Sequence, residues 1–257
     1  MTDKILADVQ DGIGWLTINN PERHNAVSIE MGQAGAEIMA RFSANTSVRV
    51  IVIRATGEKA WMSGGDIGDF TPKPGDAPRP TDGFAFYNSV YECAKPVVAA
   101  LKGYTMGGGV ALACACDLRI VATNSVFAIP AGKLGIAYPP HFLRWVIDTI
   151  GLANTKEMLF TGRRYNSDEA LRMGLVNCLV QPEALVHTVL EYAQSIVDNA
   201  PLSIRANKET MRHVVQDPSR WDKSRIAELN SICKNSSDFA EGRRAFAEKR
   251  KPVFRGE

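Results

Sequence analysis

The sequence predicts an α/β protein with a largely parallel sheet, followed by a helical C-terminal part. Nearly continuous apolar runs, typical of strands covered on both faces, alternate with helix-like segments in the first half of the chain. These runs are VRVIVIRA (48–55), PVVAALKG (96–103) and LRIVAT (118–123). From about residue 139 the pattern becomes helical, and PEALVHTVLEYAQSIVDNA (182–200) carries apolar residues at a spacing near 3.6.

The remaining segments complete the predicted order of elements. ILADV and GWLTI flank the turn signal Asp11-Gly12 and predict a β-hairpin near the N-terminus. Ser28 is a suitable N-cap for a helix from about Ile29 to Phe42. The proline-dense stretch 70–83 predicts a surface loop. Further helices are predicted at about 84–94, 202–214 and 224–248.

The overall composition narrows the classes of function. The chain has 257 residues, of which 45% are hydrophobic and 23% charged, as in ordinary globular proteins. Its net charge of +2 does not favour a nucleic-acid partner. No apolar run is long enough to cross a bilayer, and MTDKILADVQ lacks the basic-then-apolar order of a signal peptide. We therefore expect a cytoplasmic protein without a membrane partner.

The placement of cysteine and histidine argues against a metal site. Of five cysteines, only Cys114 and Cys116 lie close together, in an apolar run without histidine. Such a pair is a poor zinc site, so we expect reduced, structural thiols. The histidines show no metal-ligand spacing; they are His24, His141, His187 and His213.

Two glycine-bearing loops that follow predicted strands are the first candidates for a functional site. They are WMSGGDI (61–67) and YTMGGGVAL (104–112). Ligands bind at the carboxyl ends of parallel strands, and glycine lets a backbone N–H group approach a ligand closely. The two loops are therefore suited to hold one oxyanion jointly. The spacing alone is equally compatible with glycines that only permit tight loop-to-helix turns.

Motifs along nearly the whole chain resemble the crotonase family, the enoyl-CoA hydratases and isomerases. In family order they are PERHNAVS, KAWMSGGDI, KPVVAALKGYTMGGGVALACACDLRIVA, LFTGRRYNSDEALRMGLVN and EGRRAFAEKRKPVF. The resemblance implies a crotonase (ClpP-like) spiral of ββα units at 1–197. It also implies a helical C-terminal trimerisation region at 198–257, which builds homotrimers or, as paired trimers, homohexamers.

The same resemblance implies an acyl-CoA thioester as substrate, with no cofactor beyond the coenzyme A that the substrate carries. By motif position, the backbone N–H groups of Gly65 and Gly108 hold the thioester carbonyl oxygen. Fixed dipoles aimed at this oxygen stabilise an enolate, which many reactions share, so the fold leaves the reaction open.

Two groups of residues are implied to contact the CoA moiety. The first group offers mainly backbone atoms and consists of His24, Ala26, Val27 and Gly64. The second group, often contributed by a neighbouring subunit, serves the adenine and phosphate end and consists of Phe246, Lys249 and Phe254. Basic residues suit a phosphorylated nucleotide, although a solvated basic tail is the alternative for this segment.

Both acid/base carboxylates of typical hydratases are missing. Where those enzymes carry a glutamate in the helix after the glycine run, this chain has Ala111. Where they carry a second glutamate in a FGxPE segment, this chain reads FAIPA and has Ala131. Alanine cannot activate water or return a proton, so typical hydration and glutamate-dependent isomerisation are not expected.

The segment AGKLGIAYPPHFL (131–143) contains the best polar candidate. Its LGIAY resembles the LGxPY segment of the methylmalonyl-CoA decarboxylase branch, which implies that Tyr138 lies in the active site. A phenol can orient the departing carboxylate and help to supply a proton. That branch departs from this chain in having a histidine at Gly65 and a glutamate at Ala111. For Tyr138, a half-buried aromatic bonding a backbone carbonyl is the alternative.

Three further polar residues lie near these motifs. His141 follows two prolines that favour a helix start, and its imidazole suits either proton shuttling or a structural role. Asp66 reads as a turn or helix N-cap residue, and Asp117 reads as structural.

The reaction expected from these residues is decarboxylation, or another lyase or isomerising step, through an enolate held in an oxyanion hole. One alternative is an enoyl-CoA hydratase or isomerase that uses a different acid or base. The other is a non-catalytic acyl-CoA-binding homologue, which the loss of both glutamates suggests.

Overall fold

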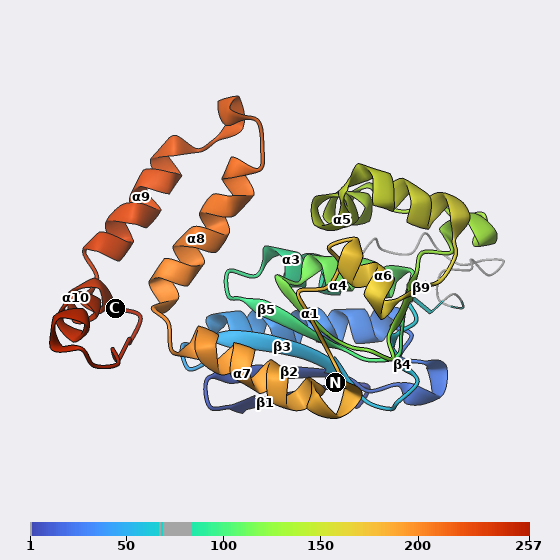
Figure 1. Ribbon diagram of the computed structural model, residues 1–257, viewed down its shortest axis with the longest axis horizontal. Coiled ribbons are helices and arrows are strands. Elements are labelled where there is room, and N and C mark those ends of the chain that lie inside the picture. The colour runs from blue at the N-terminus through green and yellow to red at the C-terminus, as the bar shows by residue number, and fades with distance from the viewer. Residues whose placement is uncertain (1, 67, 69–83) are drawn as a thin grey trace.

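The structure is a computed structural model that describes residues 2–66, 68 and 84–257 (Figure 1). The loop predicted at 70–83 lies outside the described residues. The described chain forms a core of two sheets and their helices, with an arm of helices at the C-terminal end (Figure 1).

The larger sheet has six strands in the order β1-β2-β3-β5-β7-β10. β1 and β2 form the predicted antiparallel hairpin, and the other neighbours are parallel. The apolar runs of the sequence form its central strands, as predicted. The strands are β1 (Ile5–Gln10), β2 (Ile13–Ile18), β3 (Val50–Ala55), β5 (Val97–Leu101), β7 (Leu118–Ala122) and β10 (Cys178–Val180).

A second sheet of four short strands has no counterpart in the residue patterns. Its order is β4-β6-β8-β9, with β4, β6 and β8 parallel and β9 antiparallel to β8. Strands of two or three residues are too short to show an alternation of apolar and polar residues. The strands are β4 (Ala60–Met62), β6 (Tyr104–Met106), β8 (Val126–Ala128) and β9 (Tyr165–Asn166).

The core repeats one unit along the chain, in which a long strand of the first sheet leads to a short strand of the second. β3 leads to β4, β5 to β6 and β7 to β8, and helices come next in chain order. This arrangement confirms the α/β spiral of ββα units that the resemblance implies. The helices of these units are α3 (Ala85–Glu92), α4 (Gly108–Ala115) and α5 (Pro140–Thr161), with the 3₁₀ turn η3 (Ala131–Leu134) before α5.

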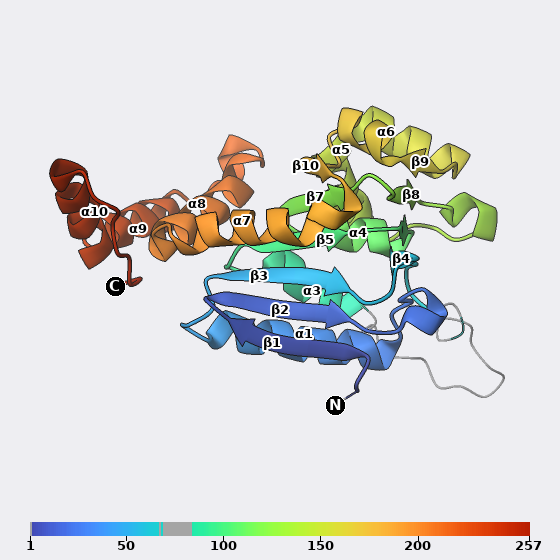
Figure 2. The same cartoon turned by 60° about the horizontal axis from the view of Figure 1, so that its bottom comes forward.

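Helices cover both faces of the larger sheet (Figure 2). On one face Ile51 and Ile53 are fully buried in a cluster with α1, α3 and α4. On the other face Val52 packs with Leu185 and Val189 of α7. Burial of each such side chain stabilises the fold by about 1.5–3 kcal/mol. The remaining core helices are α1 (Ile29–Ala44), α6 (Ser167–Arg172) and α7 (Leu185–Val197), with 3₁₀ turns η1 (Pro21–Arg23) and η4 (Pro182–Ala184).

Two helix starts agree with the sequence signals. Ser28 caps α1 by accepting a hydrogen bond from the backbone N–H of Met31 at 3.2 Å. Pro139 is the N-cap of α5 and Pro140 is its first residue, as the two prolines predict. This start places His141 in the first turn of α5.

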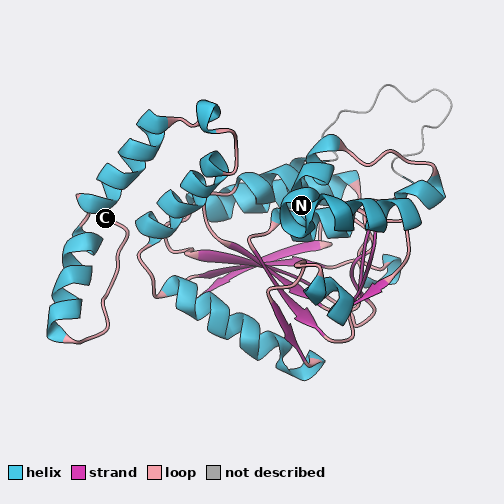
Figure 3. Ribbon diagram, turned by 45° about the horizontal axis from the view of Figure 1, so that its top comes forward, coloured by secondary structure: helices cyan, strands magenta, loops and turns pink. Residues whose placement is uncertain are grey.

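The C-terminal arm consists of α8 (Pro201–Val214), η5 (Pro218–Arg220), α9 (Lys223–Lys234) and α10 (Ser237–Glu248). It extends away from the core (Figures 1 and 3). The segment predicted to be helical at 224–248 is helical, and it is divided into α9 and α10 by a break at Asn235 and Ser236. Ser236 then caps α10 through the backbone N–H of Phe239 at 3.1 Å. Across the described residues, helices fall short of the length and apolar character needed to cross a membrane.

Candidate active site

The first glycine loop follows β4 and runs beside the segment that ends at Val27. The N–H of Val27 donates to the Gly64 carbonyl at 2.9 Å, and the N–H of Asp66 donates to the Val27 carbonyl at 3.0 Å. Successive N–H groups of an extended backbone point to opposite sides, so the N–H of Gly65 points away from Val27. Among the described residues, no carbonyl accepts a hydrogen bond from it.

The second glycine loop follows β6 and becomes α4. Gly107 has φ 50° and ψ −118°, a conformation open to glycine, and its N–H donates to the Ala128 carbonyl at 2.8 Å. Gly108 is the first residue of α4, so its N–H has no partner within the helix. That N–H also lies at the positive end of the helix dipole.

The two loops touch each other because β4 and β6 are adjacent parallel strands. A Cβ atom on Gly64 would lie 3.2 Å from the Gly108 nitrogen, and one on Gly109 would lie 2.4 Å from the Met62 carbonyl oxygen. Only glycine permits this approach without displacement. The structure therefore brings Gly65 and Gly108 to neighbouring loops, with amides suited to bind one oxygen anion.

The Tyr138 side chain contacts the backbone of the second glycine loop. Its side chain is half-buried, and its hydroxyl donates to the Gly107 carbonyl at 2.9 Å. Burial raises the pKa of Tyr138 well above its ordinary value, and the neighbouring Cys114 and Tyr87 raise this pKa further. The phenol is therefore protonated at neutral pH and holds the carbonyl next to the amide of Gly108.

His141 lies in an aromatic cluster. Its ring meets Phe84, Phe142 and Trp145 edge-on, with ring centroids 5.1, 4.6 and 5.3 Å away. Its Nε2 is buried and has no hydrogen-bond partner among the described residues. Desolvation lowers the pKa of His141, so the imidazole is neutral at pH 7. The His141 ring contacts this aromatic cluster rather than the glycine loops.

Sequence reasoning missed Tyr87 of α3. A Cβ atom on Gly108 would lie 2.7 Å from the Tyr87 hydroxyl oxygen, so this oxygen abuts the second glycine loop. The Tyr87 ring is buried and packs on Phe142 with centroids 4.7 Å apart. Nothing in the sequence distinguishes Tyr87 from an ordinary core aromatic, since its proximity to Gly108 arises only when α3 packs beside α4.

The two alanines bring no acid or base to the site. Ala111 is fully buried within α4, and Ala131 is 9% exposed at the start of η3. Asp66 pairs with Arg23 at 3.2 Å, and it accepts a hydrogen bond from the Gly68 N–H at 3.0 Å. This geometry confirms the turn role predicted for Asp66.

Asp117 is structural, as predicted. Its Oδ2 accepts a hydrogen bond from the Val97 N–H at 2.7 Å. The same oxygen binds the Lys208 ammonium group at 2.5 Å. The five cysteines are free thiols, and among the described residues no cluster of side chains suits a metal ion.

The residues expected at the CoA moiety fall into two separate groups. His24, Ala26 and Val27 run beside Gly64, and the His24 carbonyl accepts a hydrogen bond from the Ser63 N–H at 3.0 Å. The second group lies on the arm, where the Phe246 side chain is 88% exposed. α10 and β4 lie at opposite ends of the molecule (Figures 1 and 2). One chain therefore does not bring Phe246, Lys249 and Phe254 to the glycine loops.

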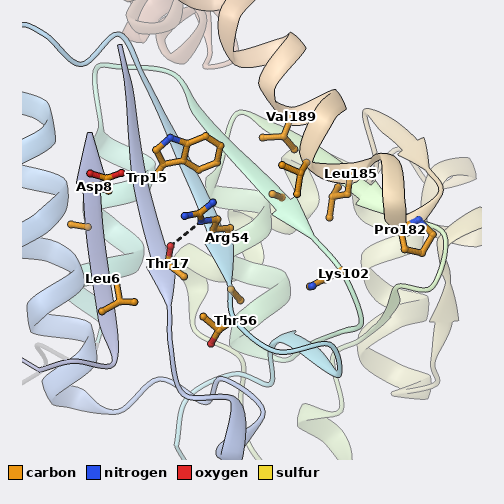
Figure 4. Close-up of a pocket in the computed structure, with 14 residues that line it drawn as sticks. Leu6, Asp8, Trp15, Thr17, Arg54, Thr56, Lys102, Pro182, Leu185 and Val189 are labelled. Atoms are coloured by element: carbon orange, nitrogen blue, oxygen red, sulfur yellow. Dashed lines mark hydrogen bonds between the residues drawn. The ribbon is translucent and has the colours of Figure 1, made fainter. Parts of the chain in front are cut away.

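A cavity of about 500 Å³ lies elsewhere, between β1–β3 and the start of α7 (Figure 4). In it the Arg54 guanidinium lies 4.5 Å from the centre of the Trp15 ring and donates to the Thr17 hydroxyl at 3.0 Å. None of the predicted site residues lines this cavity. It is therefore distinct from the candidate active site.

Comparison with known proteins places the chain in a family. The sequence model of the enoyl-CoA hydratase/isomerase family matches residues 8–257. A carnitinyl-CoA dehydratase of Citrobacter koseri is 36% identical over 248 residues, which cover 94% of each chain. A carnitinyl-CoA dehydratase of Salmonella enteritidis matches with the same identity and coverage.

Solved structures agree with this assignment. An enoyl-CoA hydratase/carnithine racemase from Magnetospirillum magneticum superimposes with a TM-score of 0.93 at 32% identity, covering 100% of this chain and 97% of that one. An enoyl-CoA hydratase from Bacillus anthracis gives a TM-score of 0.90 at 26% identity, covering 99% and 100%. The chain therefore belongs to the enoyl-CoA hydratase/isomerase (crotonase) family of acyl-CoA-processing enzymes.

Proposed function

We propose that this protein binds an acyl-CoA thioester with its carbonyl oxygen between the amides of Gly65 and Gly108. The observation that carries the proposal is the contact between the two glycine loops. In the described chain the N–H groups of Gly65 and Gly108, one on each loop, have no acceptor. Such donors stabilise the negative charge that develops on a thioester oxygen when an enolate forms. Each donor contributes about 3–4 kcal/mol to the transition state.

We propose decarboxylation as the reaction that forms this enolate. Ala111 and Ala131 stand where a carboxylate base would be needed for water addition or proton abstraction, and Asp66 is paired with Arg23. Decarboxylation needs no base. The bond between the α-carbon and the carboxylate breaks, CO2 leaves, and the electron pair enters the enolate that the two amides stabilise. A proton must then reach the α-carbon.

Tyr138 supports this site in the proposal by holding the glycine turn. Its hydroxyl proton is engaged by the Gly107 carbonyl. This geometry favours a positioning role, in which Tyr138 aims the amide of Gly108, over direct proton transfer. His141 is proposed to line the aromatic side of the site as a neutral imidazole.

Dehydration or hydration is the second candidate, and the 36% identity to carnitinyl-CoA dehydratases favours it. On this reading the chain would need an acid and a base other than residues 111 and 131. A non-catalytic acyl-CoA-binding protein is the remaining alternative.

Incubation with a mixed acyl-CoA panel, read by mass spectrometry, tests the proposal. The panel contains malonyl-type, 2-enoyl, 3-enoyl, 3-oxoacyl and 3-hydroxyacyl thioesters. Loss of CO2 from a malonyl-type member, strongly reduced in Tyr138→Phe, would support decarboxylation. Water gained by an enoyl member or lost by a 3-hydroxyacyl member would instead establish the second candidate. Tight CoA binding without turnover would establish the binding protein.

A further inference from the structure

The hydroxyl of Tyr87 abuts the second glycine loop at Gly108, on the side of that residue that also faces the first loop. The Cβ position of Gly108 lies 2.7 Å from the Tyr87 oxygen and 3.5 Å from the Cα of Gly64. The phenol oxygen and the first loop therefore approach the same side of Gly108. A thioester oxygen bound to the two amides would lie close to this phenol.

The hydrogen bonds of the site distinguish its two tyrosines. Both rings pack on Phe142, Tyr87 at 4.7 Å and Tyr138 at 5.5 Å between centroids. Tyr138 already donates its proton to the Gly107 carbonyl. Among the described residues, the Tyr87 hydroxyl has no hydrogen-bond partner. Of the two phenols, Tyr87 is thus the one whose proton is available to a ligand.

The surroundings of Tyr87 keep its hydroxyl protonated. The residue is 3% exposed, and burial raises the pKa of its phenol well above the ordinary value. A raised pKa means that the phenol is a neutral donor throughout the physiological range. A thioester enolate is a stronger base than a phenolate, so the transfer of a proton from phenol to the enolate carbon is downhill.

We propose that Tyr87 is a catalytic residue, the proton donor to the α-carbon of the enolate. This role rests on the proposed decarboxylation. After CO2 leaves, the enolate electron pair forms a new bond between the α-carbon and the phenol proton, and the O–H bond of Tyr87 breaks. The resulting phenolate regains a proton from water. Tyr87 acts as the acid in this step, and water restores its proton.

The experiment compares Tyr87→Phe with wild type on methylmalonyl-CoA in D2O. Tyr91→Phe is the matched control, because Tyr91 lies one turn later on α3 and stacks on Trp145 with centroids 5.0 Å apart. In wild type and the control we expect propionyl-CoA with one deuterium in a single configuration at the α-carbon. In Tyr87→Phe we expect kcat to fall about 100-fold or more, KM to change little, and the deuterium to lose its single configuration.

Three results would overturn the role of Tyr87. Retention of rate and configuration in Tyr87→Phe would exclude it as the donor. Loss of configuration in Tyr138→Phe alone would assign proton transfer to Tyr138. If wild type adds or removes water on the acyl-CoA panel and releases no CO2 from methylmalonyl-CoA, decarboxylation itself fails. That result is distinguishable because it appears without any substitution.

Discussion

At Gly109 the packing leaves no room for a side chain, since a Cβ atom would lie 2.4 Å from the Met62 carbonyl oxygen. The same contact joins the first turn of α4 to the end of β4. The distance between the amides of Gly65 and Gly108 is therefore set by this close approach. A methyl group at residue 109 would separate the loops and misalign both donors.

The substitution Gly109→Ala tests this dependence. Misalignment of the donors should lower kcat by about 100-fold or more, and the clash with the Met62 backbone should also lower the stability of the fold. Gly132→Ala is the control, because its nearest neighbour, the Leu159 carbonyl oxygen, would lie at an ordinary 3.6 Å. Steady-state kinetics and thermal unfolding of both variants measure the two effects. Unchanged kcat in Gly109→Ala would show that the loop contact does not align the donors.

His141 should make the stability of the fold depend on pH. Its pKa is lower in the folded state than in the unfolded chain because of desolvation, so the unfolded chain binds the proton more readily. Above the unfolded pKa of about 6.5, the imidazole is neutral in both the folded and the unfolded state, and its burial costs no deprotonation. Stability is then lost as pH falls from that value through the folded pKa.

Thermal unfolding of His141→Phe between pH 5 and 8 measures this effect. The variant should lose less stability than wild type on the acid side. The exposed His187 supplies a surface control, His187→Phe, which leaves the aromatic cluster around His141 unchanged. Equal acid losses in wild type and His141→Phe would contradict the expected desolvation.

The glycine loops of the site could be predicted from the sequence, whereas Tyr87 could not. The two glycine-bearing loops are visible along the chain, but their spacing alone left a purely structural role open, and Gly65 and Gly108 were assigned through the resemblance to the crotonase family. Tyr87 was not, because a tyrosine among Phe86 and Val90 looks like any buried helix residue. Its proximity to Gly108 depends on the packing of α3 beside α4, which no local pattern encodes.

The same distinction holds for whole elements. The long central strands were predicted because continuous β-branched runs have few other uses. The short strands β4 and β6 lead into the glycine loops but are only three residues each. Their pairing is fixed by the repeated passage from the large sheet to the small one. The glycine loops do follow strands, as predicted, but these strands belong to the second sheet.

Two carboxylates hold the C-terminal segment after α10: Asp238 accepts hydrogen bonds from the N–H groups of Arg255 and Gly256 at 2.7 and 2.8 Å, and Glu241 holds the part nearer the helix. Glu241 accepts hydrogen bonds from Arg250 at 2.6 Å and from the Val253 N–H at 3.1 Å. These partners, with Arg244, hold the pKa of Glu241 well below its usual range. Its contribution to stability is therefore present above the unfolded pKa of about 4.3 and is lost as pH falls through the lower folded pKa.

Removal of the Glu241 charge should free the part of the segment nearer the helix at neutral pH. In Glu241→Gln, we expect hydrogen exchange of the Val253 amide, which donates to Glu241, to accelerate at pH 7, while the amides of Arg255 and Gly256 stay held by Asp238. Glu248→Gln is the control, since Glu248 is half-exposed and pairs with the side chain of Arg250 rather than with the backbone of the segment. Exchange in Glu241→Gln equal to that of the control would show that Glu241 does not anchor this part of the segment.

In the whole molecule, the arm is tied to the core yet distant from the site. Lys208 of α8 is buried and binds the Lys95 carbonyl at 2.8 Å and Asp117 at 2.5 Å. This anchor fixes where the arm leaves the core. It also leaves α10, which carries Phe246 and is capped by Lys249, at the end of the molecule opposite to β4 (Figure 1). If those residues bind the adenine and phosphate end of CoA, they must do so for a neighbouring copy of the chain.

Mixing two defective variants tests this sharing of sites. Gly109→Ala impairs the glycine loops and keeps the arm, while Phe246→Ala/Lys249→Glu impairs the arm and keeps the loops. If each site combines the loops of one chain with the arm of another, a 1:1 mixture that exchanges subunits should regain about one quarter of the wild-type sites. Native mass spectrometry confirms that mixed assemblies form.

Activity no higher than the sum of the two variants, despite mixed assemblies, would show that each chain completes its own site. Full activity of the arm variant alone would remove the arm from CoA binding. Recovery in the mixture would instead explain why the arm ends in an exposed aromatic and basic segment so far from the loops of its own chain.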